Sequence, residues 1–376
     1  MSPPPAFVDV QLPFQRSLVG EPWDGTPSQS LPFPLALQTD SSVKTFDNFI
    51  TAIEDTVKKG ELIPLLAQHG GAIHFRGTHA TSPEDFSRIV HAFKLGKPHE
   101  ELGNPVIRTL LAKNVSTANE GPSTHPVYPH SEFGWSSHYP AFLSFFCRHP
   151  ANEGGETPIN SSAEVFSRLQ AEIPEFIDEL AEKGIKYEYS YKKERNPGSN
   201  LGNDVKTAYA GANLLPTDDE ATARAKIEEQ IKRHSNEWTW DEDGTLSVTH
   251  RLTIIRRDPH LKLPIVFGNL ASMTALAKKW DALEPPHLGT DGAYHHLPTY
   301  GDGTPIPTKY LEKLLQTVYD CQSLVKWELG DVLLMDNHLV QHARNPWVGD
   351  RRVLASLWDG PAPLPYKEVN NPAFRV

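Results

Sequence analysis

The sequence predicts an α+β protein whose central β-sheet is assembled from segments that lie far apart in the chain. Short apolar segments rich in β-branched and aromatic residues, typical of strands, occur at 72–76, 142–147, 325–327, 332–335 and 352–357. Segments with apolar residues at helical spacing lie among them. Strands near both ends with helices between them favour mixed architecture over an all-helical or all-β fold.

Each helix is expected from its apolar spacing and from the residues that begin or end it. Phe46, Phe49 and Ile53 repeat at helical spacing, and Gly70 follows the end of that segment. Ser82 is a candidate N-cap for the second helix. Helices are predicted at 45–67, 83–95, 162–169, 174–183, 218–234 and 308–324, and residues 238–248 form a hairpin around Asp241 to Gly244.

The domain organisation is expected to be simple. Residues 1–40 are rich in proline and weakly periodic, which predicts an extended N-terminal arm. Residues 41–376 are predicted to form a single domain, with a helical and hairpin insert at about 185–260.

Composition limits the classes of function. Of 376 residues, 36 are Lys or Arg and 47 are Asp or Glu, and the net charge of −11 argues against nucleic acid as a partner. Cys147 and Cys321 are too few for a disulfide framework and fit a reducing compartment. The sequence shows no signal peptide and no apolar run of the roughly 20 residues needed to span a bilayer. We therefore expect a cytoplasmic protein without a membrane partner; its oligomeric state stays open.

Three residues could bind a metal. His130 and Glu132 lie two residues apart on an extended segment, so their side chains point to one side. His342 follows an apolar strand and a turn, and can supply a third ligand. Two histidines and one carboxylate on one face of an octahedron are typical of non-haem Fe(II) oxygenases.

The same residues are compatible with several different kinds of protein. His130 and Glu132 could form an ordinary surface contact, and His338 could replace His342. Zinc hydrolases use the same ligand set. A ligand-binding protein without catalysis, or an interaction protein that uses the helix at 218–234, would also fit.

A second cluster of residues points to an anionic ligand. Gly154 to Pro158 follows the first motif, and Arg351 and Arg352 follow His342 at the start of an apolar strand. An arginine there needs an anionic partner. For Arg352 this could be one of the many Asp or Glu residues of the chain, or a bound carboxylate, to which the Thr157 hydroxyl could add a hydrogen bond.

The chain resembles the taurine-dioxygenase and clavaminate-synthase-like family of Fe(II)/2-oxoglutarate oxygenases. The similar stretches run in order from about residue 70 to residue 358. They are Gly70 to Gly77, Thr117 to Glu120, His130 to Glu132, Phe145 to Cys147, Gly154 to Ile159, Gly301 to Gly303, Gly330 to Asn337, His342 to Arg344 and Arg351 to Leu357.

The resemblance implies a double-stranded β-helix (jelly-roll) core and the cofactors Fe(II), 2-oxoglutarate and O₂. It implies His130, Glu132 and His342 as iron ligands. It also implies that Arg352 holds the far carboxylate of 2-oxoglutarate, assisted by Thr157, with Arg351 as the alternative. The expected reaction oxidises an unactivated C–H bond by hydroxylation, desaturation or ring closure, and releases succinate and CO₂.

The substrate is expected to be a small molecule. Taurine-type members carry an arginine for the sulfonate at the position of Ser356, which argues against a small sulfonate. Glu132 is one methylene longer than aspartate and could leave one oxygen for a substrate amine. Phe133 and Trp135 could wall an apolar side chain, and Arg344 and Asn119 could hold a carboxylate. The hypothesis is an amino acid or an amino-acid-derived secondary metabolite.

Overall fold

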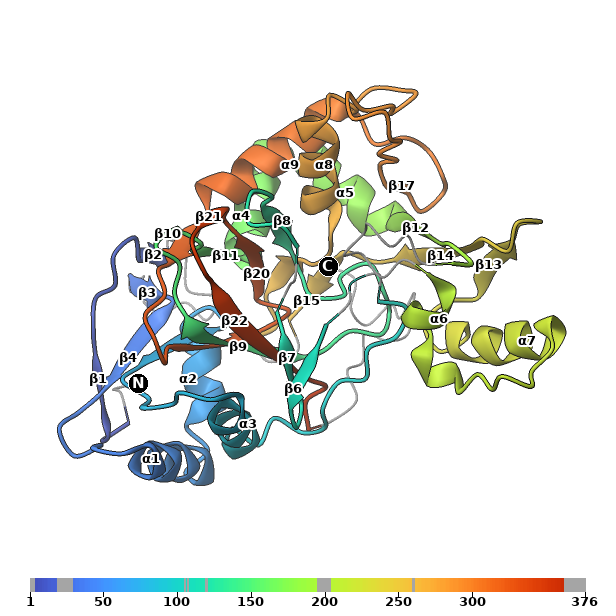
Figure 1. Ribbon diagram of the computed structural model, residues 1–376. Coiled ribbons are helices and arrows are strands. Elements are labelled where there is room, and N and C mark those ends of the chain that lie inside the picture. The colour runs from blue at the N-terminus through green and yellow to red at the C-terminus, as the bar shows by residue number, and fades with distance from the viewer. Residues whose placement is uncertain are drawn as a thin grey trace.

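The structure is a computed structural model that describes residues 4–18, 30–104, 106, 108–118, 121–194, 204–258 and 261–361 (Figure 1). Its centre is a mixed eight-stranded sheet in the order β1-β4-β5-β19-β9-β22-β7-β6, antiparallel except between β4 and β5. Its strands are β1 (Phe7–Asp9), β4 (Leu35–Thr39), β5 (Ala72–Arg76), β6 (Leu110–Ala112), β7 (Val115–Thr117), β9 (Phe142–His149), β19 (Val332–Asp336) and β22 (Arg352–Trp358). The four middle strands are those that the sequence predicts.

A four-stranded antiparallel sheet, in the order β18-β11-β20-β8, provides the second layer. Its strands are β8 (Val127–His130), β11 (Thr157–Ser161), β18 (Ser323–Val325) and β20 (Val340–Arg344). Phe145 and Met335 of the large sheet belong to the same hydrophobic cluster as Ile159 and Val340 of the small one. The main core therefore includes inward-facing residues of both sheets. The strand predicted at 325–327 lies two residues earlier, because Trp327 already belongs to the loop.

Helices cover the outer faces. Phe49, Ile53 and Phe86 pack with Ile73 and Phe146 in a second cluster on the outer face of the large sheet. In Figure 1, α1 and α3 lie below that sheet, and α4, α5, α8 and α9 lie together above. The helices are α1 (Phe46–Lys58), α2 (Leu62–Gln68), α3 (Pro83–Ala92), α4 (Ser162–Glu172), α5 (Pro174–Lys183), α8 (Leu270–Lys279) and α9 (Thr308–Asp320).

Most of the predicted helices are confirmed, with two differences. The helix expected at 45–67 is divided into α1 and α2, because Gly60 between them has φ +71°, outside the helical region. Helix α8 and the four-residue helix Val205–Ala208 were not predicted. Ser82 caps α3 as expected: its hydroxyl accepts from the backbone N–H of Asp85, whose carboxylate accepts from that of Ser82.

The insert region has a sheet and a core of its own. Strands β13-β14-β12-β17 form a four-stranded antiparallel sheet, and the predicted hairpin is β13 and β14, with Gly244 at φ +80° in its turn. Helix α7 lies far to the right in Figure 1, away from α4 and α9. The elements are β12 (Ile185–Tyr191), α6 (Val205–Ala208), the short 3₁₀ helix Ala210–Ala212, α7 (Glu220–Ile231), β13 (Glu237–Trp240), β14 (Leu246–Leu252) and β17 (Thr299–Tyr300).

Two strands of the N-terminal segment, β1 and β4, belong to the large sheet and pair with each other. Leu35 and Leu37 of β4 are buried beside β5.

Three two-stranded ribbons complete the described part of the fold: β2 (Arg16–Leu18) with β3 (Leu31–Phe33), β10 (Glu153–Gly154) with β21 (Trp347–Val348), and β15 (Ile255–Arg257) with β16 (Pro264–Val266).

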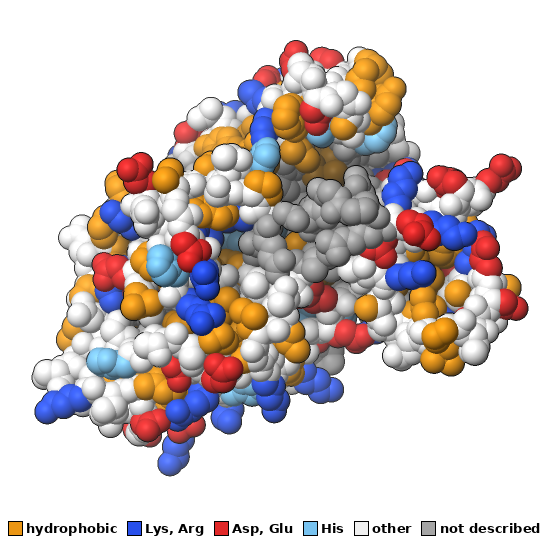
Figure 2. All heavy atoms as spheres, in the orientation of Figure 1, with side chains coloured by type: hydrophobic (Ala, Val, Ile, Leu, Met, Phe, Trp, Pro, Cys, Tyr) orange, Lys and Arg blue, Asp and Glu red, His pale blue; other side chains and the backbone are white. Residues whose placement is uncertain are grey.

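The described surface mixes charges of both signs. On the face in Figure 2, acidic and basic side chains alternate and neither sign forms an extended patch. Among the described residues, no helix combines the length and apolarity needed to cross a bilayer.

Gly71 connects the start of β5 to the turn between β19 and β20. Its carbonyl accepts from the backbone N–H of Asp336, and its φ is +86°. A Cβ at this position would lie 2.6 Å from Cβ of Leu339 and 3.2 Å from a methyl carbon of Val340. The lack of a side chain at Gly71 thus lets the turn that leads into β20 pack directly against the start of β5.

We predict that Gly71→Ala lowers the free energy of unfolding by about 2 kcal/mol more than Gly60→Ala, measured by urea denaturation. Both glycines have positive φ, so both variants incur the same kind of backbone strain. Gly60 has no atom within 4 Å of its ideal Cβ, so only Gly71→Ala adds a clash. Equal losses in the two variants would show that the turn adapts freely.

Candidate metal centre

The two histidines of the candidate site are brought together by strand register. His130 ends β8 and His342 lies in the middle of β20, and the antiparallel pairing places them directly opposite each other. Their ring centroids are 4.3 Å apart. The sequence predicted that His342 follows a turn. In the structure it also lies within a strand, β20.

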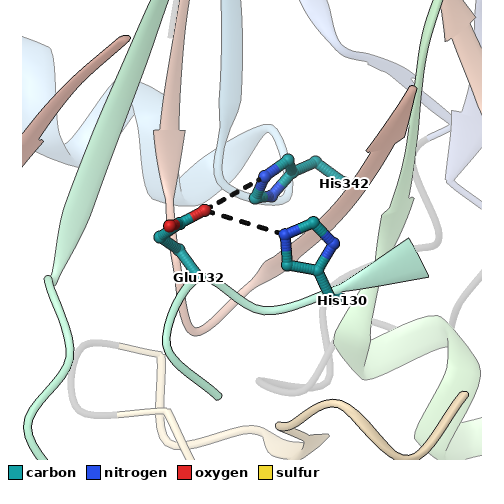
Figure 3. A group of neighbouring side chains, drawn as sticks. All are labelled: His130, Glu132 and His342. Atoms are coloured by element: carbon teal, nitrogen blue, oxygen red, sulfur yellow. Dashed lines mark ion pairs between the residues drawn. The ribbon is translucent and has the colours of Figure 1, made fainter. Parts of the chain in front are cut away.

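Glu132 completes the group from the turn that follows β8 (Figure 3). Its Oε2 lies 3.7 Å from Nε2 of His130 and 3.4 Å from Nε2 of His342. One donor atom from each residue lies within 4.8 Å of the other two. Nδ1 of His130 lies 2.8 Å from the carbonyl of Tyr128. In the tautomer with a proton on Nδ1, the N–H donates to that carbonyl and the lone pair of Nε2 is available to a metal.

Asn337 fixes the backbone of Glu132. Its side-chain oxygen accepts from the N–H of Glu132 at 2.7 Å, and its amide donates to the carbonyls of Glu132 at 2.9 Å and Pro140 at 2.8 Å. Asn337 is fully buried. The family resemblance included this residue in a matching stretch without giving it a role, because only the fold brings it to a segment about 200 positions earlier.

The protonation states suit metal binding. Burial alone would raise the pKa of Glu132, but the charge of Arg108 and hydrogen bonds with His130 and His342 hold it well below its usual range. Burial, followed by the charge of His130, lowers the pKa of His342 to about 4. At neutral pH Glu132 is therefore an anion and His342 is neutral, which are the forms that bind a metal.

Arg108 lies beside Glu132 and was not predicted. Its Nη2 lies 2.5 Å from Oε1 of Glu132. The oxygen that the sequence hypothesis left for a substrate amine therefore already accepts from Arg108. No motif surrounds Arg108 in the sequence, so no pattern could have identified it.

His338 belongs to a different buried group. It lies with Asp258 and Asp336, and the guanidinium of Arg256 lies over the rings of Tyr139 and Phe267 that His338 also contacts. Of the two histidines considered for the third ligand, the structure places His342 with His130 and Glu132.

A cavity of about 630 Å³ opens beside the three candidate ligands. Phe133, Trp135 and Tyr189 form an aromatic wall, in which the rings of Trp135 and Tyr189 lie 4.6 Å apart. Helix α8 contributes a second side. Its lining residues there and just beyond are Ser272, Met273, Leu276, Lys279 and Trp280.

Thr157 and Arg351 lie together in the cavity wall. Oγ1 of Thr157 accepts from Nε1 of Trp327 at 3.0 Å and from Nη2 of Arg351 at 3.4 Å. Nε of Arg351 donates to the carbonyl of Gly155 at 2.8 Å, which fixes the guanidinium. Because Thr157 accepts both bonds, its own O–H is directed elsewhere and can reach a bound oxygen anion.

Arg352 points away from the cavity, which corrects the first expectation for this residue. Its side chain is 58% exposed and forms an ion pair with Asp350 at 3.0 Å. Neighbouring residues at the start of a strand face opposite sides, and the register of β22 against β9 shifts between Arg352 and Val353. The sequence placed the arginine pair correctly, but it could not show which member faces inward.

Three of the four residues predicted to contact the substrate line the cavity. Phe133 and Trp135 line the cavity and are buried. Arg344 also lines it, but its Nη2 donates to the carbonyls of Pro122 and His125. Asn119 lies outside the described residues.

Comparisons with known proteins place the chain in a family. Residues 33–358 match the model of the taurine catabolism dioxygenase TauD, TfdA family. The chain is 30% identical over 359 residues to a clavaminate synthase-like protein from Arabidopsis thaliana, covering 93% of this chain and 98% of that protein. It is 26% identical to the dapdiamide synthesis protein DdaC from Enterobacter agglomerans, covering 77% of this chain and 82% of DdaC. A crystal structure of a taurine dioxygenase from Burkholderia xenovorans gives a TM-score of 0.47 at 14% identity, with 90% and 92% of the two chains covered.

The family match identifies the class of protein as a non-haem iron oxygenase. The chain belongs to the TauD, TfdA dioxygenase family, whose model matches most of its length. It is an Fe(II)- and 2-oxoglutarate-dependent dioxygenase that uses O₂, as the resemblance implied, and its described residues include a suitable cluster of two histidines and a glutamate.

Proposed function

We propose that the chain oxidises an unactivated C–H bond of a small carboxylate-bearing molecule, an amino acid or a metabolite derived from one. Iron would be held by His130, Glu132 and His342. The observation that carries the proposal is that their donor atoms lie on the same cavity as Thr157 and Arg351. A zinc hydrolase would have no use for that second pair of residues.

Arg351 and Thr157 are proposed to hold the far carboxylate of 2-oxoglutarate. Arginine recognises a carboxylate through parallel N–H bonds, and a hydroxyl adds another donor. Burial lowers the pKa of Arg351 to about 10, so it is still a cation at neutral pH. Gly155 and Trp327 position the two side chains before the cosubstrate binds.

Iron with 2-oxoglutarate and O₂ supplies an oxidant for the C–H bond and yields succinate and CO₂. The protein residues have the task of placing that bond. Phe133, Trp135 and Tyr189 form a rigid aromatic surface, and its packing excludes water from one side of the cavity. Hydroxylation, desaturation and ring closure are all compatible with this arrangement.

The charges of the cavity support a carboxylate on the substrate. Among the described lining residues, Glu132 is the one carboxylate, whereas four side chains are cationic. Arg351 is proposed for the cosubstrate and Arg108 contacts Glu132. Lys279 is proposed to face another anion, together with Arg344, whose Nη2 also donates to the carbonyls of Pro122 and His125. If Arg351 is the cosubstrate arginine, the residue four positions later is Ala355, so a second arginine for a sulfonate is again absent from that position.

The two layers of sheet are proposed to be the walls of a double-stranded β-helix. Both are mainly antiparallel, and consecutive strands β19 and β20 belong to different sheets. Their inward-facing residues share one core. This architecture would fix the metal ligands at the end of β8 and within β20.

The iron ligands are tested by comparing His342→Ala with His338→Ala. We expect His342→Ala to abolish Fe(II)-dependent conversion of 2-oxoglutarate to succinate, because it removes a donor that no nearby side chain replaces. His338→Ala should retain Fe(II)-dependent turnover, since His338 lies in another cluster. Loss of turnover in the second variant but not in the first would refute the ligand set.

The cosubstrate arginine is tested by Arg351→Gln, with Arg352→Gln as the matched control. Loss of a charged, buried contact should raise the KM for 2-oxoglutarate by about a hundredfold. Arg352→Gln should leave the KM unchanged, because that side chain pairs with Asp350 in solvent. The reverse pattern would return the role to Arg352.

The substrate class is tested with a panel of L- and D-amino acids, their N-acetyl derivatives and their carboxamides. Each is added with Fe(II), ascorbate and 2-oxoglutarate, and succinate release and product mass are measured. We expect a free carboxylate to be required, so carboxamides should not stimulate succinate release. If only compounds without a carboxylate stimulate it, the proposed substrate class is wrong while the cofactor chemistry stands.

A further inference from the structure

Arg108 is the cation nearest the candidate ligand Glu132. Its side chain is 11% exposed, and its Nη2 lies 2.5 Å from Oε1 of Glu132. Its Nη1 lies 3.6 Å from Oε1 of Glu101. The guanidinium is thus held between two carboxylates in the wall of the cavity.

The two oxygens of Glu132 have different neighbours. Oε2 faces Nε2 of both His130 and His342, at 3.7 and 3.4 Å. Oε1 faces Arg108. One oxygen of the carboxylate, Oε2, therefore faces the two histidines, and the other, Oε1, forms a charged hydrogen bond with Arg108.

We propose that Arg108 is a positioning residue that occupies Oε1 of Glu132, so that this side chain offers the iron a single oxygen. The inference rests on the proposed function, in which Glu132 is an iron ligand. It assigns Arg108 a role for which the sequence gives no signal.

The number of oxygens that Glu132 supplies decides whether O₂ can bind. Two imidazoles and one carboxylate oxygen leave positions open for both oxygens that 2-oxoglutarate provides and for O₂. A second oxygen from Glu132 would take the last of these positions. Restricting Glu132 to one oxygen would thus keep the cosubstrate complex open to O₂.

Both the backbone and the carboxylate of Glu132 must be held in place for the side chain to keep one orientation. Its backbone is fixed by Asn337, but glutamate has one more rotatable bond than aspartate, so this alone does not fix the carboxylate. Without Arg108, Oε1 would be a buried oxygen that has lost its charged partner, which is costly. The nearest remaining cation would be the metal, and the carboxylate would turn toward it.

The test is Arg108→Met, which removes every donor and keeps a long side chain. Binding of Mn(II) alone is measured from the EPR signal of free Mn(II), and binding of nitric oxide, a stand-in for O₂, is measured anaerobically by EPR on the Fe(II)–2-oxoglutarate complex. We expect Mn(II) affinity to be retained or increased. The apparent affinity for nitric oxide should fall roughly tenfold or more, because a carboxylate oxygen must now be displaced.

Two variants control for general damage. Arg76→Met removes a similar partly buried ion pair, since Arg76 is 17% exposed and lies 3.1 Å from the buried Asp331, outside the cavity. It should change neither measurement. Arg108→Lys keeps the charge and one donor, and should restore nitric oxide binding toward the wild-type value.

Wild-type nitric oxide affinity in Arg108→Met would overturn the inference. Loss of Mn(II) binding would also overturn it, because Arg108 would then be needed for the structure of the metal site and not for occupying Oε1 of Glu132. A failure of the underlying function is recognised separately: His342→Ala would then still bind Mn(II) with wild-type affinity. If His342→Ala loses Mn(II) and Arg108→Met behaves as wild type, only the role of Arg108 is wrong.

Discussion

The pairing of β8 with β20 is the contact on which the site depends. It places His342 opposite His130, although more than 200 residues separate them in the chain. Their ring centroids are 4.3 Å apart, and Phe145 packs against the ring of His342 at 5.2 Å. A shift of one residue in this pairing would turn His342 to the other face of the sheet and separate the ligands.

The turns around this pair of strands depend on few residues. Asn337 links the turn after β19 to the backbone of Glu132, and Gly71 allows that turn to approach β5 closely. The candidate ligand Glu132 is therefore fixed through the same turn that leads into the strand of His342. The buried amide of Asn337 thus positions the candidate site through the backbone of Glu132.

The described lining of the cavity is rich in cationic side chains, although the protein as a whole is acidic. The net charge is −11, yet the described lining of the cavity has one carboxylate and four cationic side chains. The three arginines among them have different neighbours: Arg108 contacts Glu132, Arg351 contacts Thr157, and Arg344 donates to backbone carbonyls. The negatively charged cosubstrate 2-oxoglutarate fits this distribution, because cationic side chains attract an anion.

The sequence by itself determined many of the helices and strands and suggested the candidate ligands. The middle strands of the large sheet, the cap at Ser82 and the motif with His130 and Glu132 follow from local patterns, which short segments carry in full. The tertiary structure decided which of Arg351 and Arg352 faces the cavity, because strand register sets that choice. It also separated His338 from His342 and brought Arg108 to Glu132. Contacts between distant segments leave no local pattern, so only the folded chain shows them.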